Sequence, residues 1–360
     1  MMPDTPDHMT GVVLPGDSSV RFGEYPVPEP GHGQVLLKMK ASSICGSDIR
    51  AIYREHLGKG PEAYQGVIAG HEPAGEVVAL GPGIRERKLG DRCVVYHISG
   101  CGCCDDCRHG YQISCTSENH RKAYGWQRDG GHAEYLVADE VDLVSLPDNL
   151  TFVDGAFMAC GFGTAWECLT RMKTCGRDRL LITGLGPVGL AAAQLARVLG
   201  AREIIGLDLE GPRLELATEM RFTSDVPLVD HAIASNDDAV DAIMDATGGR
   251  GCEVSIDCSG AAAARLIALK ATGRWGRCGF VGEGGKIEFD VSPLLIHQQI
   301  TLFGSWVTSV KHLSDLAELL GRLDVHPEAT AGPKLPLDEA AEAYDLADKG
   351  ETAKVCIVME

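Results

Sequence analysis

Hydrophobic and polar positions follow two different patterns along this chain of 360 residues. Up to about residue 155, short β-like runs such as 33–43 and 73–81 are separated by Gly and Pro turns, and Ala-rich helical patterns are scarce. Beyond that point, apolar runs that end in glycine alternate with amphipathic stretches. Strand–helix alternation of this kind predicts a parallel, doubly wound sheet.

The second pattern can be divided into individual elements. It predicts strands at 179–186, 202–209, 252–260, 276–285 and 300–306, helices at 187–201, 212–220 and 310–323, and a helix, a turn and a strand within 340–360. The chain is long for one compact core and comfortable for two. We therefore expect two domains of different architecture.

Composition and charge narrow the class of protein. The apolar fraction is 44 %, no run of about 18 apolar residues occurs, and the start lacks the features of a signal peptide. The formal net charge is −18, so the surface repels nucleic acid and anionic lipid. We expect a cytoplasmic protein without a nucleic-acid or membrane partner, in a reducing setting where clustered cysteines favour metal over disulfides.

Residues 99–115 hold five of the 14 cysteines. Four of them have the spacing C-x2-C-x2-C-x7-C: Cys101, Cys104, Cys107 and Cys115. Four thiolates surround a tetrahedral zinc and leave no position for substrate, so the spacing predicts a structural zinc site with Cys103 as a bystander. An iron–sulfur cluster is the competing interpretation. A zinc ribbon that binds nucleic acid is disfavoured by the acidic charge.

Three further segments offer ligands for a second, open metal site. "SSICGSDIR" contains Cys45 and Asp48, "IAGHEPAGEV" contains His71 and Glu72, and "FMACGFGTAWECL" contains Cys160. Two thiolates and one imidazole leave a fourth position for water or an alcohol oxygen. The separations along the chain are large, so spacing alone does not join these residues.

The segment "GLGPVG" follows a strand pattern and opens a helix pattern, which in that context is a dinucleotide-binding fingerprint. Gly184 permits the tight turn, Gly186 lets the backbone approach a pyrophosphate, and Gly189 allows close packing of the helix. Pro187 and Val188 begin that helix, whose N-terminus favours the anion.

Asp208 ends the next predicted strand, 19 residues after Gly189. A carboxylate there accepts hydrogen bonds from the adenosine ribose and repels a 2′-phosphate, so we expect NAD rather than NADP. Arg213, near the start of the next helix, lies either against the adenine and solvent or against a phosphate.

Taken in order, these motifs resemble the zinc-dependent medium-chain alcohol dehydrogenase family over residues 11–354. The resemblance implies a GroES-like, mostly-β catalytic domain formed by 1–156 and 304–360. It implies a Rossmann NAD-binding domain, a doubly wound parallel sheet, at 157–303. Association into a homodimer or homotetramer is also implied.

The same resemblance assigns roles to the residues of the open site. Its catalytic zinc ligands are Cys45, His71 and Cys160. Glu72 is similar to the carboxylate that approaches the zinc during ligand exchange. Asp48 is similar to the hydrogen-bond acceptor that orients a ligand histidine. Ser47 is similar to the hydroxyl that takes the proton of the alcohol.

Arg50 departs from part of the family, in which a histidine three residues after the hydroxyl ends a proton relay. Arginine does not release a proton near neutral pH. Its guanidinium fits phosphate geometry, so we expect Arg50 to bind the cofactor pyrophosphate. The relay would then use the cofactor ribose and water, or His56.

The sequence thus predicts an NAD-dependent alcohol dehydrogenase with two zinc ions per chain. It would oxidise a primary or secondary alcohol, or a polyol or sugar hydroxyl, to the carbonyl by hydride transfer. Polar residues offered for a hydroxylated substrate are Arg54, Glu55, His56, Tyr124 and Trp126. The alternatives are a non-catalytic NAD-binding protein stabilised by zinc, and a zinc-independent enone or quinone reductase.

Overall fold

The computed structural model describes residues 5–117 and 119–359, and the chain divides into two compact units. Unit 1 comprises Met1–Gly163, Thr308–Gly350 and Lys354–Glu360, and unit 2 comprises Thr164–Val307 and Glu351–Ala353. The main boundaries therefore fall at 163/164 and 307/308 rather than at the expected 156/157 and 303/304. The first moves because α4 (Gly163–Arg171) begins there, after a helical segment that remains with unit 1.

Unit 1 is built mainly from strands. Its described strands are β1 (His8–Val13), β2 (Arg21–Pro26), β3 (Gln34–Ser43), β4 (Glu72–Leu80), β5 (Arg92–Val95), β6 (Ile98–Ser99), β7 (Lys122–Ala123), β8 (Tyr135–Asp139), β9 (Leu143–Ser145), β18 (Ala331–Pro336) and β19 (Lys354–Val358). Its described α-helices are α1 (Gly46–Asp48), α2 (Asp105–Arg108), α3 (Phe152–Phe157), α9 (Val310–Leu323) and α10 (Ala340–Lys349).

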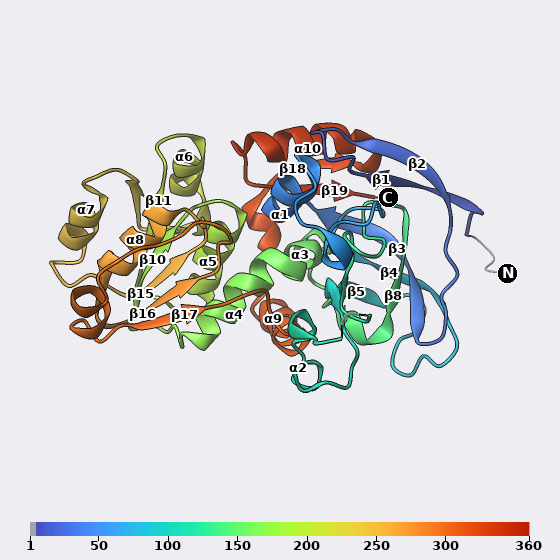
Figure 1. The fold of residues 1–360 in the computed structure, drawn as a ribbon, viewed down its shortest axis with the longest axis horizontal. Helices are drawn as coiled ribbons and strands as arrows, with labels where there is room; N and C mark the ends of the chain where they lie inside the picture. The colour runs from blue at the N-terminus through green and yellow to red at the C-terminus, as the bar shows by residue number, and fades with distance from the viewer. Residues whose placement is uncertain (1–4, 118, 360) are drawn as a thin grey trace. The chain divides into compact units, whose positions relative to one another are not determined.

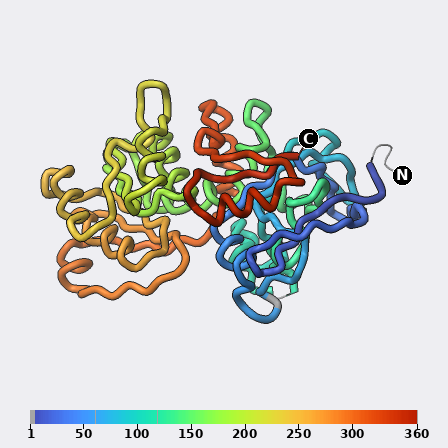
Figure 2. Tube along the Cα trace, turned by 90° about the horizontal axis from the view of Figure 1, so that it is seen from above, coloured from blue at the N-terminus to red at the C-terminus, as the bar shows by residue number. Residues whose placement is uncertain are grey.

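A seven-stranded sheet organises unit 1 in the order β18-β19-β3-β4-β5-β9, with β8 also paired to β3. The central strand β3 pairs antiparallel with β19, β4 and β8, so most of its side chains are covered. Val35, Leu37 and Met39 pack with Val77 and Val95 in a core cluster. Figure 2 shows the C-terminal segment beside N-terminal strands, as the β3–β19 pairing requires.

Unit 2 alternates strands and helices. Its described strands are β10 (Arg179–Thr183), β11 (Glu203–Asp208), β12 (Arg221–Thr223), β13 (Val226–Pro227), β14 (His231–Ala234), β15 (Cys252–Asp257), β16 (Thr272–Phe280) and β17 (Thr301–Gly304). Its α-helices, besides most of α4, are α5 (Pro187–Val198), α6 (Pro212–Glu219), α7 (Ala239–Ala246) and α8 (Ala262–Ala271).

Six parallel strands form the sheet of unit 2 in the order β14-β11-β10-β15-β16-β17 (Figure 1). When the strands of this sheet alone are numbered along the chain, the order is 3-2-1-4-5-6, that of a dinucleotide-binding doubly wound fold. Every residue of the central strand β10 is buried, as expected for a strand with helices packed on its sheet. The predicted combination of a mostly-β domain with a Rossmann domain is confirmed.

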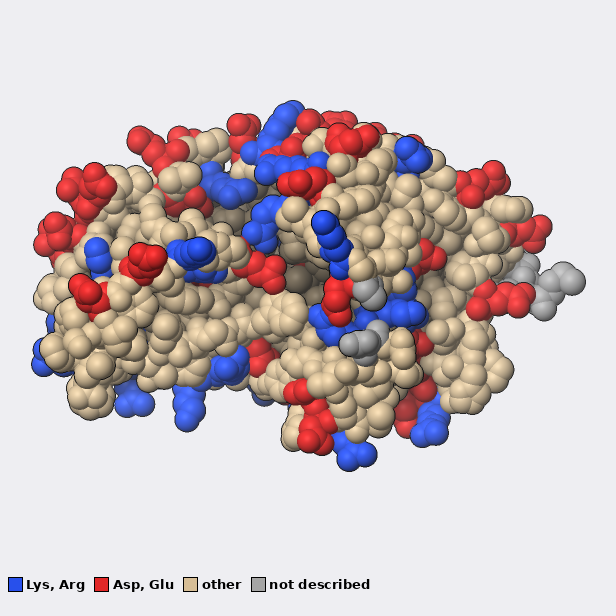
Figure 3. Space-filling view, viewed as in Figure 1, with Lys and Arg blue, Asp and Glu red and all other residues tan. Residues whose placement is uncertain are grey.

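Two further features are the distribution of charged side chains on the surface and the hydropathy of the helices. Asp and Glu side chains are scattered over the face shown in Figure 3 rather than gathered at one end. Within the ranges that the structure describes, no helix combines the length and apolar character needed to cross a membrane. Oligomerisation stays a prediction.

Candidate zinc and cofactor sites

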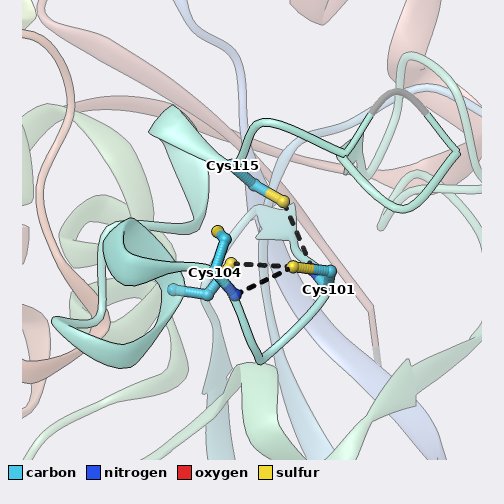
Figure 4. A group of neighbouring side chains, drawn as sticks. Cys101, Cys104 and Cys115 are labelled. Atoms are coloured by element: carbon cyan, nitrogen blue, oxygen red, sulfur yellow. Dashed lines mark hydrogen bonds between the residues drawn. The ribbon is translucent and has the colours of Figure 1, made fainter.

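The four-cysteine lobe is one of two groups of metal-ligating side chains in the described part of the chain. The sulfur atoms of Cys101, Cys104, Cys107 and Cys115 all lie within 4.8 Å of one another. Figure 4 shows Cys101, Cys104 and Cys115 gathered on the loop around α2, with the hydrogen bonds between them. Cys103 is exposed and stands outside the group, although its sulfur lies 3.5 Å from that of Cys101.

Backbone amides prepare this lobe for a cation. The amides of Cys103 and Cys104 lower the pKa of Cys101 to about 6, because N–H groups stabilise the thiolate. The amide of Cys107 likewise lowers the pKa of Cys104, whereas burial raises that of Cys107 to about 12. Four convergent thiols of this kind fit a closed tetrahedral zinc shell.

The second group unites the open-site residues that the sequence leaves far apart. Ligand atoms of Cys45, His71, Glu72 and Cys160 lie within 4.8 Å of one another. Cys45 precedes α1, His71 precedes β4, and Cys160 belongs to a π-helical turn, Met158–Phe162. Pairing of β3 with β4 sets Ser43 opposite Glu72, which brings the first two segments together.

Asp48 links two of these residues. Its Oδ1 lies 2.7 Å from Nδ1 of His71, and its Oδ2 accepts a hydrogen bond of 3.1 Å from the Cys45 amide. Trp126 also donates its Nε1–H to Oδ1, at 3.3 Å. With Nδ1 engaged by a fully buried carboxylate, Nε2 of His71 is left to bind a metal. Asp48 therefore contacts a histidine of the predicted ligand set, as the expected orienting acceptor would.

Charges within this group are strongly coupled. A hydrogen bond with Cys160, aided by His71 and Lys354, holds the pKa of Cys45 well below its ordinary value. The same bond, with burial, raises the pKa of Cys160. Burial opposes charge on His71, yet the Asp48 carboxylate raises its pKa. Two thiols and an oriented imidazole are a donor set that suits zinc and leave a position open.

Glu72 has two partners that sequence reasoning did not identify, Ser43 and Lys354. The Ser43 hydroxyl donates to Oε2 of Glu72 at 2.5 Å, and Nζ of Lys354 lies 2.6 Å from the same oxygen. Burial raises the pKa of Glu72 to about 7, opposed by the charge of Lys354. A lysine at the start of the otherwise apolar strand "KVCIV" was the available signal, because a buried lysine needs a partner.

The other residues predicted for unit 1 fall in different surroundings. Ser47 is half-buried in α1, and Arg50 is exposed in the following π-helical segment, Ile49–Tyr53. Their roles stay predictions. Tyr124 is wrong as a lining residue: it is fully buried and donates its hydroxyl to Asp142 rather than facing a substrate.

Three other side chains offered to substrate also have defined positions. Arg54 forms an ion pair with Asp348 at 2.5 Å, and a ring nitrogen of His56 lies 2.8 Å from the Leu14 carbonyl oxygen. Glu55 is exposed. None of the three belongs to the metal-ligating group that the described residues form.

The glycine turn of unit 2 has the geometry that a bound dinucleotide needs. Gly184 has a φ of +92°, and a Cβ there would lie 2.8 Å from the Cβ of Ser259. A Cβ on Gly189 would lie 1.8 Å from the Gly184 carbonyl oxygen, so α5 packs against the turn only with glycine there. Gly186 caps α5, with Pro187 and Val188 as its first residues. The turn ends at a helix N-terminus suited to phosphate.

Asp208 and Arg213 both lie beside this turn. Oδ2 of Asp208, at the end of β11, accepts a hydrogen bond of 2.6 Å from the Leu185 amide. Nη1 of Arg213 lies 3.6 Å from the place that a Cβ on Gly186 would take. A carboxylate and a guanidinium therefore flank the turn, and the carboxylate holds its backbone.

Comparison with protein families divides the chain in the same two parts. Residues 31–148 match the alcohol dehydrogenase GroES-like domain, and residues 187–323 match the zinc-binding dehydrogenase domain. These matches lie within unit 1 and largely within unit 2, respectively.

Individual proteins resemble the chain over nearly its full length. An uncharacterized zinc-type alcohol dehydrogenase-like protein of Escherichia coli K12, YphC, is 47 % identical over 97 % of this chain and 98 % of its own. L-threonine 3-dehydrogenase of Pyrococcus horikoshii is 32 % identical over 94 % of each.

A solved structure gives the same picture. Alcohol dehydrogenase TADH from Thermus sp. ATN1 has a TM-score of 0.86 at 28 % identity, over 98 % of this chain and all of that one. The chain therefore belongs to the zinc-dependent medium-chain alcohol dehydrogenase family, whose oxidoreductases bind zinc and a nicotinamide cofactor.

Proposed function

We propose that this protein is an NAD-dependent dehydrogenase of secondary alcohols, including polyol-type alcohols, with one catalytic and one structural zinc per chain. The observation that carries the proposal is the convergence of Cys45, His71 and Cys160 within a 4.8 Å group whose fourth member, Glu72, is paired with Lys354. Three such ligands would leave one position of a four-coordinate zinc to an oxygen. A non-catalytic zinc protein would not need a three-ligand site of this kind in addition to the four-cysteine site.

A zinc ion bound there would polarise a hydroxyl oxygen, and a nicotinamide would accept hydride from the adjoining carbon. The chain's own residues prepare these events. Asp48 keeps a proton on Nδ1 of His71, and Lys354 neutralises Glu72, so the group carries less excess negative charge. Ser47, between Cys45 and Asp48 along the chain, is the proposed acceptor of the alcohol proton.

NAD is favoured over NADP by the position of Asp208. Its carboxylate ends β11 and is tied to the glycine turn, where it would meet a ribose hydroxyl and repel a 2′-phosphate. Arg213 lies across Gly186, so we assign its cation to the pyrophosphate side of the cofactor rather than to a 2′-phosphate.

Two matched variants test the two zinc roles. Cys45→Ser should lose one zinc per chain and turnover while keeping its affinity for NAD, since the glycine turn lies in unit 2. Cys104→Ser should lose one zinc and primarily lower the unfolding temperature. The measurements are zinc per chain, NAD affinity by calorimetry, melting temperature and NAD-linked oxidation of a panel of simple alcohols, polyols and sugars.

Each alternative predicts a different result. Near-normal turnover by Cys45→Ser would refute the catalytic assignment. NAD binding without turnover of any alcohol in the panel would favour a non-catalytic protein. Reduction of enones by the metal-depleted protein would favour the zinc-independent reductase.

A further inference from the structure

A network of hydrogen bonds joins several strand ends of unit 2. Asp257, the last residue of β15, is fully buried. Its Oδ1 accepts hydrogen bonds from the hydroxyls of Thr183, at 3.0 Å, and Ser259, at 2.7 Å. Its Oδ2 accepts a hydrogen bond of 3.0 Å from the Gly260 amide. The carboxylate therefore ties the end of β10 to the turn that follows β15.

Arg265 extends this network to the loop after β16. Its Nε donates to Oδ2 of Asp257 at 3.3 Å, and its Nη1 donates to the Gly285 carbonyl oxygen at 2.8 Å. The carbonyl oxygens of Gly282 and Gly284 accept further hydrogen bonds from the same guanidinium. All three nitrogen atoms of the guanidinium are thus engaged, and most of their acceptors belong to the loop after β16.

The position of Arg265 in α8 is unfavourable for a cation. Arg265 is the fourth residue of this helix, within about one turn of its N-terminus. Positive charge at a helix N-terminus is opposed by the helix dipole. The side chain of Arg265 is only 11 % exposed, so water can offset little of that cost. The Asp257 carboxylate and the loop carbonyls supply the compensating acceptors.

Close backbone contacts connect this network to the glycine turn. A Cβ on Gly184 would lie 2.8 Å from the Cβ of Ser259, and a Cβ on Gly260 would lie 2.1 Å from the Glu283 carbonyl oxygen. The turn after β15 is therefore in contact with the glycine turn on one side and with the 282–285 loop on the other. These three segments form one continuous layer along the carboxyl ends of β10, β15 and β16.

The strand order indicates which part of a dinucleotide this layer would meet. The order reverses between β10 and β15, and doubly wound sheets bind a dinucleotide across that point, beyond the carboxyl ends of the strands. The proposed cofactor would place its pyrophosphate at the glycine turn and its adenosine ribose at Asp208, which ends β11. Its nicotinamide half would then extend over β15 and β16, where the 282–285 loop lies.

We propose that Arg265 is a positioning residue that sets the affinity of unit 2 for the nicotinamide half of the cofactor, through the 282–285 loop and without touching the cofactor itself. This inference rests on the function proposed above and deepens its account of cofactor binding. The planar guanidinium holds the loop carbonyls in place before the cofactor arrives, so binding does not have to order the loop. Without those hydrogen bonds, ordering the loop would lower the affinity.

Calorimetry with NADH and with ADP tests the inference, because both ligands carry adenosine and a pyrophosphate but only NADH carries the nicotinamide half. Arg265→Lys keeps a cation beside Asp257 but lacks the planar fork that reaches separate carbonyls. Arg265→Met removes the cation as well. We expect both variants to weaken NADH binding by about 10-fold or more, with the larger loss in Arg265→Met, and to change ADP binding by less than about 2-fold.

Arg277→Lys is the matched control, because Arg277 also joins a carboxylate to backbone carbonyls. Its Nη2 donates to Oδ1 of Asp178 at 2.5 Å, and its Nη1 donates to the Met172 carbonyl oxygen at 2.6 Å. Arg277 pairs with Thr301, the first residue of β17, and so lies away from the carboxyl ends of the strands. This substitution should lower the melting temperature and leave the ratio of NADH to ADP affinity unchanged.

Hydrogen exchange gives a second readout that does not depend on turnover. The amides of residues 282–286 should exchange faster in Arg265→Met than in the wild-type protein before any ligand is added. Saturating NADH should restore their protection, whereas saturating ADP should not. Faster exchange confined to α8, or spread over the whole of unit 2, would assign Arg265 a purely structural role and overturn the inference.

Three results of the binding experiment would also overturn the inference. The first is an equal loss of affinity for NADH and ADP. The second is a change of the ratio in Arg277→Lys as large as that in Arg265→Lys. The third is a wild-type ratio in Arg265→Lys with a loss confined to Arg265→Met, which would assign the effect to the charge beside Asp257 rather than to the carbonyl hydrogen bonds.

Failure of the proposed function gives a different pattern. Wild-type protein that binds NADH but oxidises no alcohol would refute the proposed function, and the comparison of NADH with ADP would still decide the role of Arg265. Wild-type protein that binds ADP no more weakly than NADH would show that the nicotinamide half adds no affinity, and would refute the role of Arg265 alone.

Discussion

Breaking the buried ion pair between Lys354 and Glu72 should strongly destabilise unit 1. Glu72 is fully buried, Lys354 is 3 % exposed, and Nζ lies 2.6 Å from Oε2. Nζ also donates to the Ile44 carbonyl at 3.3 Å. Lys354→Met replaces the lysine by an apolar side chain of similar length. The substitution removes the cation and leaves the Glu72 carboxylate without a counter-charge.

The expected cost follows from this burial. Removing one partner of a buried ion pair destabilises a protein by about 3–5 kcal/mol, because the other charge stays desolvated. Protonation of Glu72 relieves part of that cost, since burial already raises its pKa to about 7 with the lysine present. We therefore expect Lys354→Met to lower the free energy of unfolding by about 3 kcal/mol at pH 7.5.

A double-mutant cycle isolates the pair. In a Glu72→Gln background no carboxylate remains, so Lys354→Met should cost less than about 1 kcal/mol. Lys334→Met is the matched control on the neighbouring strand β18, because its ion pair with Glu328 is partly exposed and should contribute about 0–1 kcal/mol. The assay is urea unfolding of the zinc-saturated variants followed by far-ultraviolet circular dichroism.

Two results would refute the reasoning. One is a loss in Lys354→Met no larger than that in Lys334→Met. The other is an equal loss with and without the Glu72 carboxylate, which would assign the effect to the packing of the lysine stem rather than to its charge.

Two further predictions concern buried carboxylates of unit 1. Asp142 accepts hydrogen bonds from Ser99 and Tyr124, and burial raises its pKa to about 7. Because the folded state then holds this proton more tightly than the unfolded state, its stabilising contribution is complete below about pH 4 and is lost as pH rises to about 7. Asp142→Asn should remove this decline in stability with pH, which amounts to at most about 1.4 kcal/mol per pH unit. The variant should therefore be more stable than the wild-type protein at pH 8. Urea unfolding from pH 4 to 8 measures this, and parallel plots of the free energy of unfolding against pH for the two proteins would contradict it. Asp48→Asn should weaken zinc binding at the open site by about 10–100-fold, because an amide replaces the anionic acceptor of His71 and places an NH2 donor against one of the N–H groups that the carboxylate serves. Chelator competition measures this, and unchanged zinc affinity would contradict the orienting role.

Local patterns predicted the elements that a short stretch of chain determines. The helix expected at 310–323 is α9 to the residue, since its apolar stripe lies within the segment and its Ser309 cap directly precedes it. The glycine turn was equally readable, because the requirements at Gly184 and Gly189 arise from each other and from the strand and helix they join. In contrast, β14 escaped prediction: it is a four-residue edge strand without a fully buried position.

The two candidate metal sites also differ in how much of each could be predicted from the sequence, because one is formed by a short stretch of chain and the other by distant segments. The four-cysteine lobe lies within 15 residues, so its spacing alone indicates a metal. Cys45, His71 and Cys160 required the ordered resemblance to a family, because only the β3–β4 pairing and a distant helical turn bring them together. Ser43 carried no local signal, and a lysine in an otherwise apolar strand indicates that a partner exists but not which one, so the partnership of both residues with Glu72 appears only in the fold.

This contrast separates the physical roles of the two metal-ligating groups. The lobe draws all four sulfurs from one loop, so binding a metal there mainly closes that loop locally. The open group and its Lys354–Glu72 pair draw on β3, β4, β19 and the turn at Cys160, and therefore exist only when unit 1 is assembled. Its charges are balanced by Lys354, which pairs with Glu72, and by Asp48, which contacts His71, so the donors are held in place before any metal binds. An incomplete shell of this kind, held by the fold rather than by the metal, is what a reacting oxygen requires.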